Sequence, residues 1–61
     1  MAKPELIAEV IRQWIAATDN LPTRGYVAKQ CEISLGQAHD EIVRWTARHA
    51  RQVDVGIWEL I

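Results

Sequence analysis

The sequence has little cysteine, little net charge and no long hydrophobic run, and each shortage argues against a class of protein. Cys31 is the only cysteine among 61 residues, so no internal disulfide can form, whereas small secreted domains usually carry several. No apolar run approaches the roughly 20 residues of a membrane span, and the charged N-terminal segment is unlike a signal peptide. We therefore expect a cytoplasmic protein without membrane contact, in which Cys31 is a small buried hydrophobic residue.

Patterns typical of catalysis and of metal binding are also missing. His39 and His49 are ten positions apart, too far for the i,i+4 pair of a helical metal site, and no Cys/His cluster has zinc spacing. The sequence shows no catalytic combination of a nucleophile, a base and a residue that orients the base. It also has no Gly-rich loop of the kind that binds phosphate. A chain of 61 residues also leaves little room for a pocket. The sequence predicts no enzyme, no metal site and no cofactor.

What the chain does contain is enough apolar sequence for one compact core. Hydrophobic residues make up 49% of it, which argues against disorder, and the length fits one domain over residues 1–61. A domain this small buries only about 60% of the surface of its unfolded chain, so its stability margin is thin. We expect Trp14, Trp45 and Trp58 to lie in the core rather than to stack on single-stranded nucleic acid.

Hydrophobic periodicity predicts a first helix over about residues 4–18. Pro4 suits its first turn, and Asp19-Asn20 followed by Pro22 ends it. Its apolar stripe consists of Leu6, Ile7, Val10, Ile11, Trp14 and Ile15.

Two further helices follow from their caps. Thr23 caps a second helix over about residues 24–31, in which Tyr26 or Val27 points inward. Ser34 opens a third helix that runs to about residue 48 or 49, and Ser34 with Gln37 fits a capping box.

From Arg51 onward the pattern changes to β-branched and aromatic residues. Val53, Val55 and the ending 57–61 predict two short strands, with Val55-Gly56 or Asp54-Val55 as the turn. The predicted fold class is therefore mainly α with a short C-terminal β-hairpin, a three-helix winged helix-turn-helix.

The stretch over residues 24–43 has helix-turn-helix spacing. Such a unit needs a small residue where its helices cross, apolar residues late in the first helix and in the turn, and an apolar inner face on the second helix. These positions hold Ala28, Cys31, Ile33, Ala38 and Ile42. The spacing predicts that the third helix is held at a fixed angle with its N-terminal half projecting.

Two glutamates depart from this pattern. Glu32 stands where a turn glycine is usual, which indicates a tighter or more strained turn. Glu41 stands at a rather inward position, where it either extends its carboxylate to solvent or pairs with Arg44 or Arg48 on the same helix.

The order of these motifs resembles that of the small winged-helix regulators of fimbrial operons in enteric bacteria, the FaeA/PapI type. The likeness covers about residues 6–61 and is carried by Pro22-Thr23-Arg24, Ala28, Ile33-Ser34, Gln37-Ala38, Ile42 and Gly56-Ile57-Trp58-Glu59-Leu60. This chain departs from that family in its much shorter wing, which lacks a basic Gly-rich tip, and in acidic residues on the third helix. The resemblance implies a bacterial or mobile-element transcription regulator that contacts DNA alone or together with a larger regulator.

A DNA-reading helix presents its first two turns to the major groove. Here these turns hold Ser34, Leu35, Gly36, Gln37, His39, Asp40 and Val43. Gln37 is best suited to read a base, since glutamine pairs bidentately with adenine, although it could serve only as the capping partner of Ser34. His39 could donate to a phosphate or a base edge, and Asp40 repels phosphate unless it accepts from a cytosine amino group. Phosphate contacts that position the protein are expected from Arg24, Lys29, Arg44, Arg48 and Arg51, with a solvated face as the alternative.

The net charge of −1 is small for a protein that neutralises phosphates. Residues 24–52 carry five basic and three acidic side chains, a charge of +2, while the remainder carries −3. The leading hypothesis is a sequence-specific DNA-binding regulator that inserts its third helix, about Ser34 to Arg48, into the major groove.

Two alternatives remain open. The near-neutral charge, Asp40, Glu41 and the short wing favour a protein-protein interaction module on the same scaffold. A helical adaptor would instead require the last ten residues to be helical or disordered. The expected partner is duplex DNA, and because one small module buries little DNA surface, a larger regulator or a second copy is expected as well.

Overall fold

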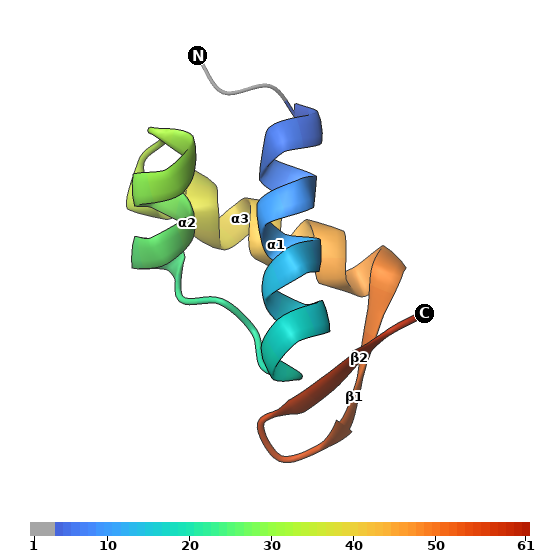
Figure 1. The fold of residues 1–61 in the computed structure, drawn as a ribbon. Helices are drawn as coiled ribbons and strands as arrows, with labels where there is room; N and C mark the ends of the chain where they lie inside the picture. The colour runs from blue at the N-terminus through green and yellow to red at the C-terminus, as the bar shows by residue number, and fades with distance from the viewer. Residues whose placement is uncertain (1–3) are drawn as a thin grey trace.

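In a computed structural model that describes residues 4–61, three helices are followed by an antiparallel hairpin (Figure 1). The elements are α1 (Pro4–Thr18), α2 (Arg24–Cys31), α3 (Leu35–His49), β1 (Ala50–Asp54) and β2 (Ile57–Leu60). This is the mainly helical winged helix-turn-helix that the sequence predicts, and residues 1–3 of the predicted domain lie outside the described range. The strands exclude the purely helical adaptor.

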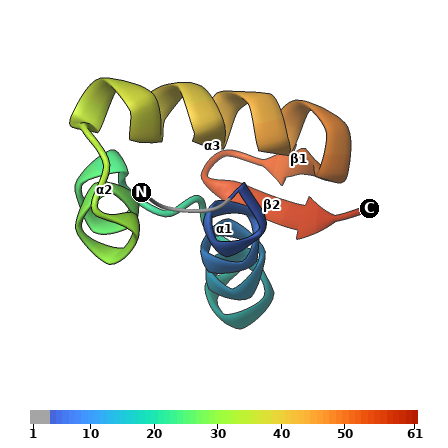
Figure 2. The same ribbon diagram turned by 90° about the horizontal axis from the view of Figure 1, so that it is seen from above.

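α3 lies across one side of the molecule, and the other elements lie on its opposite side. Figure 2 shows α1, α2 and the hairpin all beneath α3. Within residues 4–61 nothing covers the upper side of α3 in that view. None of the helices in this range combines the length and the hydropathy needed to span a bilayer.

The core forms where the three helices meet. Its buried residues are Ile7, Ile11, Ile15, Val27, Cys31, Ala38, Ile42 and Ala50. Ala28 and Ile33 pack against them half-buried, so all five helix-turn-helix positions contribute to the core as predicted. Cys31 is only 2% exposed, and burial raises the pKa of its thiol, which keeps the thiol protonated at neutral pH.

Parts of the predicted apolar surface lie outside this core. Leu6 on α1 is 47% exposed, and Val27 rather than Tyr26 takes the inward position of α2. Trp45 and Trp58 pack half-buried against the core. The core prediction is wrong for Trp14, whose half-buried ring lies beside that of Tyr26, with 4.6 Å between the ring centroids.

The connection between α2 and α3 fixes the angle of the helix-turn-helix. Thr23 caps α2, and its hydroxyl accepts from the Tyr26 backbone N–H at 3.1 Å. Glu32 ends α2 with a left-handed backbone (φ 55°), and Ile33 N donates to Ala28 O at 3.1 Å. A left-handed conformation costs a non-glycine residue roughly 1–2 kcal/mol. The strained turn expected from Glu32 is confirmed.

The hairpin is short and attached to the core by one face. β1 pairs with β2 so that Ala50 lies opposite Leu60, and the register shifts between Gln52 and Asp54, which leaves Val53 as a bulge. The turn is Val55-Gly56, with Gly56 at φ +71°. Trp58 and Leu60 are half-buried against the helices. Trp58 N also donates to Asp19 O at 2.7 Å, which ties β2 to the end of α1.

Candidate nucleic-acid interface

The first turn of α3 is capped by one of the two hydrogen bonds of a capping box. The Ser34 hydroxyl accepts from the Gln37 backbone N–H at 3.1 Å. No reciprocal bond from the Gln37 side chain to Ser34 N is found within residues 4–61, and Gln37 is exposed. The structural role foreseen for Gln37 is therefore only half realised. Its carboxamide stays available to a ligand.

The uncovered face of α3 carries most of the residues predicted to meet bases. Leu35, Gly36, His39, Asp40 and Val43 are all exposed. Positions four apart lie on one side of a helix, so Leu35, His39 and Val43 form one edge of this face. Gly36, Asp40 and Ala47 lie between this edge and a second edge, which Gln37, Arg44 and Arg48 form. We call the whole surface the outer face of α3.

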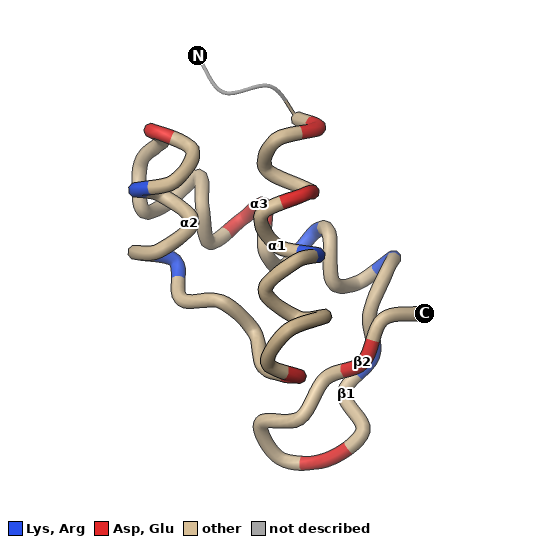
Figure 3. The backbone as a smooth tube through the Cα atoms, in the orientation of Figure 1, with Lys and Arg blue, Asp and Glu red and all other residues tan. Residues whose placement is uncertain are grey.

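The five predicted phosphate-binding cations differ in their partners. Arg44 pairs with half-buried Glu41 at 3.1 Å, as anticipated for an inward glutamate. Within residues 4–61, no ion pair is found for Arg24, Lys29 or Arg48. An exposed ion pair contributes only about 0–1 kcal/mol, so a phosphate could displace Glu41 from Arg44. In Figure 3 the basic positions of this group lie on α2, on the C-terminal half of α3 and on the hairpin.

The hairpin offers less to an anion. Its one arginine, Arg51, is bonded to Glu59 on the neighbouring strand. The turn follows acidic Asp54, whose carboxylate accepts from Val55 N at 2.7 Å, and Val55 is 90% exposed. Arg51 was predicted as a phosphate contact, and the structure places it on a strand, away from the outer face of α3.

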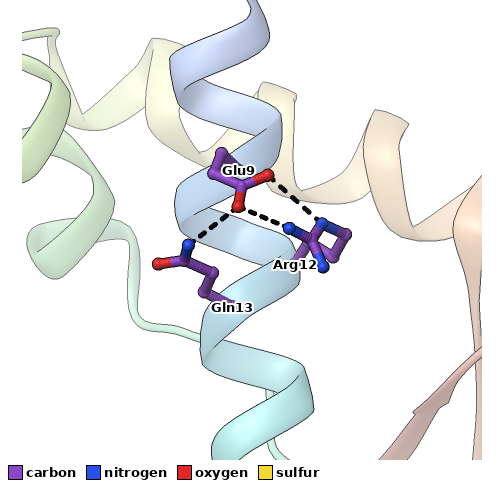
Figure 4. Close-up of polar contacts among 3 residues, drawn as sticks. All are labelled: Glu9, Arg12 and Gln13. Carbon is purple, nitrogen blue, oxygen red and sulfur yellow. Dashed lines mark hydrogen bonds and ion pairs between the residues drawn. The ribbon is translucent and has the colours of Figure 1, made fainter.

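Acidic and basic side chains are also paired on α1, in a cluster that is remote from this face. Glu9 accepts from the Arg12 guanidinium, with 3.2 Å from Nε, and from the Gln13 amide at 2.7 Å. Figure 4 draws the three side chains on the near side of α1, with α3 passing behind the helix. The hydrogen bond and charge of Arg12, with the bond from Gln13, lower the pKa of Glu9.

Two surface hollows border α1. One, of about 210 Å³, lies between α1 and α3 and is lined by Pro4, Ile7, Ala8, Ile11, Glu41, Arg44, Trp45, Arg48 and His49. The other, of about 450 Å³, lies between α1 and α2 and is lined by Val10, Gln13, Trp14, Ala17, Thr18, Tyr26 and Gln30. The first is smaller than typical ligand pockets. The second borders the Trp14 indole, whose buried N–H has no hydrogen-bond partner in residues 4–61.

Metal ligands are not gathered in the part of the chain that the structure describes, where no three of His, Cys, Asp and Glu come close enough to hold an ion. Comparisons of the chain with protein-family models, characterised proteins and solved structures gave no match. The resemblance to fimbrial regulators therefore stays a prediction, and a functional argument rests on the geometry of the outer face of α3.

Most residues of the outer face of α3 could be predicted from the sequence, but one exposed residue and the ion pairing of the arginines could not. Position along a helix was enough to find the exposed residues from Leu35 to Val43. The exposed Ala47 further along the face was missed, although it follows Val43 by one turn. The sequence left open whether Glu41 pairs with Arg44 or with Arg48, and it missed the pairing of Arg51, because the hairpin register decides the partner of Arg51.

Proposed function

We propose that this chain is a sequence-specific DNA-binding transcription regulator that inserts α3 into the major groove. The observation that carries the proposal is the outer face of α3, which no other element of residues 4–61 covers and which begins at an exposed, capped N-terminus. A major groove is wide enough to admit one α-helix. The helix-turn-helix packing holds α3 rigidly for this purpose.

Exposed cations on α2 and α3 support contact with the phosphate backbone. Arg24 begins α2, Lys29 stands in its last turn, and Arg48 stands in the last turn of α3. Their side chains are exposed, and none is engaged in an ion pair within residues 4–61. Contacts of this kind fix the orientation of a protein on the duplex and carry no sequence information.

Polar side chains on the outer face of α3 are suited to recognise bases. The free Gln37 carboxamide can donate to N7 and accept from N6 of one adenine. The carboxylate of Asp40 is exposed and in no ion pair within residues 4–61, so it is free to accept from the N4 amino group of cytosine.

A titration of a fluorescent mixed-sequence duplex at increasing salt tests this proposal. If Arg24, Lys29 and Arg48 each neutralise one phosphate, the slope of log K against log salt is about −3. Arg48→Gln is expected to reduce the slope by about one. Arg12→Gln removes an arginine from the α1 cluster of Figure 4 and serves as the matched control, with an unchanged slope. Absence of binding at low salt and high protein concentration would refute DNA binding.

A protein-binding module is the second candidate, favoured by one observation. Asp40 lies in the middle of the outer face of α3, beside the edge that exposed Leu35 and Val43 form. An apolar surface with a single acid suits a protein as well as a groove. Under this alternative the duplex titration shows no binding, and Val43→Asp abolishes capture of a partner while the fold is retained.

A further inference from the structure

We propose that the outer face of α3 reads thymine through its 5-methyl group, with Val43 and Leu35 as the contacting side chains and Gly36 as the point of close approach. The inference rests on the proposed function, because the methyl group lies in the major groove. It specifies the class of sequence that this face prefers, namely sites with thymines at fixed positions.

Exposed apolar side chains on this face provide the first support. Leu35 and Val43 are 55% and 54% exposed, and neither belongs to the core cluster or packs against it. Because a helix rises 1.5 Å per residue, the two residues are about 12 Å apart along α3, so they meet different base pairs. Apolar contact with the thymine methyl is a recognised mode of base readout, and no other base of unmodified DNA carries such a group.

Gly36 provides a second, independent support, because the fold does not need a glycine there. Apart from its chain neighbours and the backbone of its own helix, nothing in residues 4–61 lies within 4 Å of the space that a β-carbon would occupy at Gly36, and the backbone there has no positive φ. Glycine is a poor helix former compared with alanine. Because glycine has no side chain, nothing projects from the outer face of α3 at this position, and the backbone can approach a base edge closely.

The same reasoning accounts for the position of the arginines of α3 on one edge of the face. Arg44 and Arg48 stand with Gln37 on the edge opposite Leu35 and Val43. A helix in the groove then directs its cations to one phosphate strand and its apolar edge to the base methyls. The face thus combines one electrostatic edge with one apolar edge, an arrangement that suits a groove lined with thymine.

Deoxyuridine substitution gives the sharpest test, because it removes the methyl group and leaves base pairing intact. Duplexes are first enriched on the full chain from a randomised library of about two helical turns. Each thymine of an enriched duplex is then replaced singly by deoxyuridine. Loss of one buried methyl is expected to weaken binding about fourfold at one or more positions.

Variants of the chain tie that effect to particular side chains. Val43→Ala is expected to bind the thymine and deoxyuridine duplexes equally at one position, and Val43→Thr, which keeps one methyl group, to retain part of the difference. Val53→Ala truncates a comparably exposed valine on the hairpin and is expected to leave the discrimination unchanged.

Glycine variants separate stability from recognition. Gly36→Ala is expected to raise the melting temperature by about 4–8 °C and to weaken binding of the enriched duplex. Gly25→Ala changes the same second position of α2, where the space is equally open, and is expected to raise the melting temperature without changing the thymine preference.

The outcomes distinguish this inference from the proposed function. Salt-dependent binding with no deoxyuridine effect at any position overturns thymine readout and leaves DNA binding intact. A deoxyuridine effect that persists in both Val43→Ala and Leu35→Ala overturns the assignment to these side chains. If no duplex is enriched and none binds at low salt, both the inference and the proposed function fail, and the outer face of α3 belongs to a protein partner.

Discussion

The outer face of α3 and the hairpin are the two surfaces that a winged helix can offer to DNA, and in this chain they differ. Both expose apolar side chains, Val43 on α3 and Val53 and Val55 on the hairpin. The cations of the two surfaces differ more. Arg48 on α3 has no ion pair within residues 4–61, whereas Arg51, the one arginine of the hairpin, is bonded to Glu59.

The difference indicates a division of roles within a very small molecule. The hairpin directs Trp58 and Leu60 against the helices and is tied to Asp19 by a backbone hydrogen bond. Its tip carries Asp54 and a nearly fully exposed Val55, with no basic residue. We infer that the hairpin chiefly completes the core, while α3 presents the binding surface.

The largest expected effect comes from removing the side chain that attaches the hairpin. Trp58→Ala is expected to lower the free energy of unfolding by about 2 kcal/mol, less than for a fully buried tryptophan because Trp58 is only half-buried. For a domain of this length that is a large share of a total of roughly 3–9 kcal/mol. Urea denaturation followed by far-ultraviolet circular dichroism measures it.

Val55→Ala is the control for that experiment, since the side chain lies on the same hairpin and is 90% exposed. Its unfolding free energy should stay within about 0.5 kcal/mol of the wild-type value. Equal stability of the two variants would show that Trp58 adds nothing to the core. It would refute the view that the hairpin serves to complete the core.

The next largest effect is expected in the turn between α2 and α3, which orients the outer face of α3. Glu32→Gly relieves a left-handed backbone at φ 55° and is expected to stabilise the fold by about 1 kcal/mol. It also removes a negative charge close to α3, so affinity for a duplex should not fall. Thermal unfolding and a duplex titration check the two statements.

Asp19→Gly is a matched control, because Asp19 also has a positive φ of 59°. Aspartate tolerates this conformation better than glutamate does. The stabilisation should therefore be smaller than for Glu32→Gly. A larger gain at position 19 would contradict the view that the α2-α3 turn is the strained one.

A smaller effect separates the cations of the two surfaces directly. Arg48→Gln on α3 is expected to make the loss of DNA affinity between 50 and 200 mM salt about threefold smaller, because that is the share of one phosphate contact. Arg51→Gln on the hairpin is expected to leave the salt dependence unchanged, because its guanidinium is held by Glu59. Equal effects of both variants would show that the wing takes part in binding.

The helices could be predicted from the sequence because their ends are encoded locally. Pro4, the Thr23 cap and the Ser34 cap each act within a few residues of themselves, and α1 and α2 span the predicted ranges. The inward turn of Val27 instead of Tyr26 could not be read this way, since it depends on how α2 is rotated against α1. The pairing of Trp14 with Tyr26 has the same origin.

For the candidate site, helical geometry was enough to predict which positions are exposed. It was not enough to predict which of those side chains are free to bind a ligand. The freedom of the Gln37 side chain depends on which rotamer it adopts, and a capping-box pattern gives both options equally. The ion pair of Arg51 depends on strand register, and the bulge at Val53 shifts that register within β1. Neither the rotamer of Gln37 nor the strand register can be predicted from the pattern of residue types alone.

The smallest effect is expected on the side of α1 shown in Figure 4, which serves as a baseline for both surfaces. The pKa of Glu9 is lowered in the folded state, first by its hydrogen bond from Arg12 and then by that from Gln13. A carboxylate with a lowered folded pKa stabilises the fold above its unfolded pKa of about 4.3, and this contribution disappears as the pH falls through the folded pKa. Glu9→Gln should thus slightly lower the melting temperature at pH 7 and leave it unchanged well below pH 4. Because the side chains of Arg12 and Glu9 are 49% and 44% exposed, salt should weaken the difference at pH 7, and the same variant should leave duplex affinity unaltered. A change in affinity as large as that of Arg48→Gln would mean that the bound surface extends around α1, and the contrast between α3 and the hairpin would then describe only part of it.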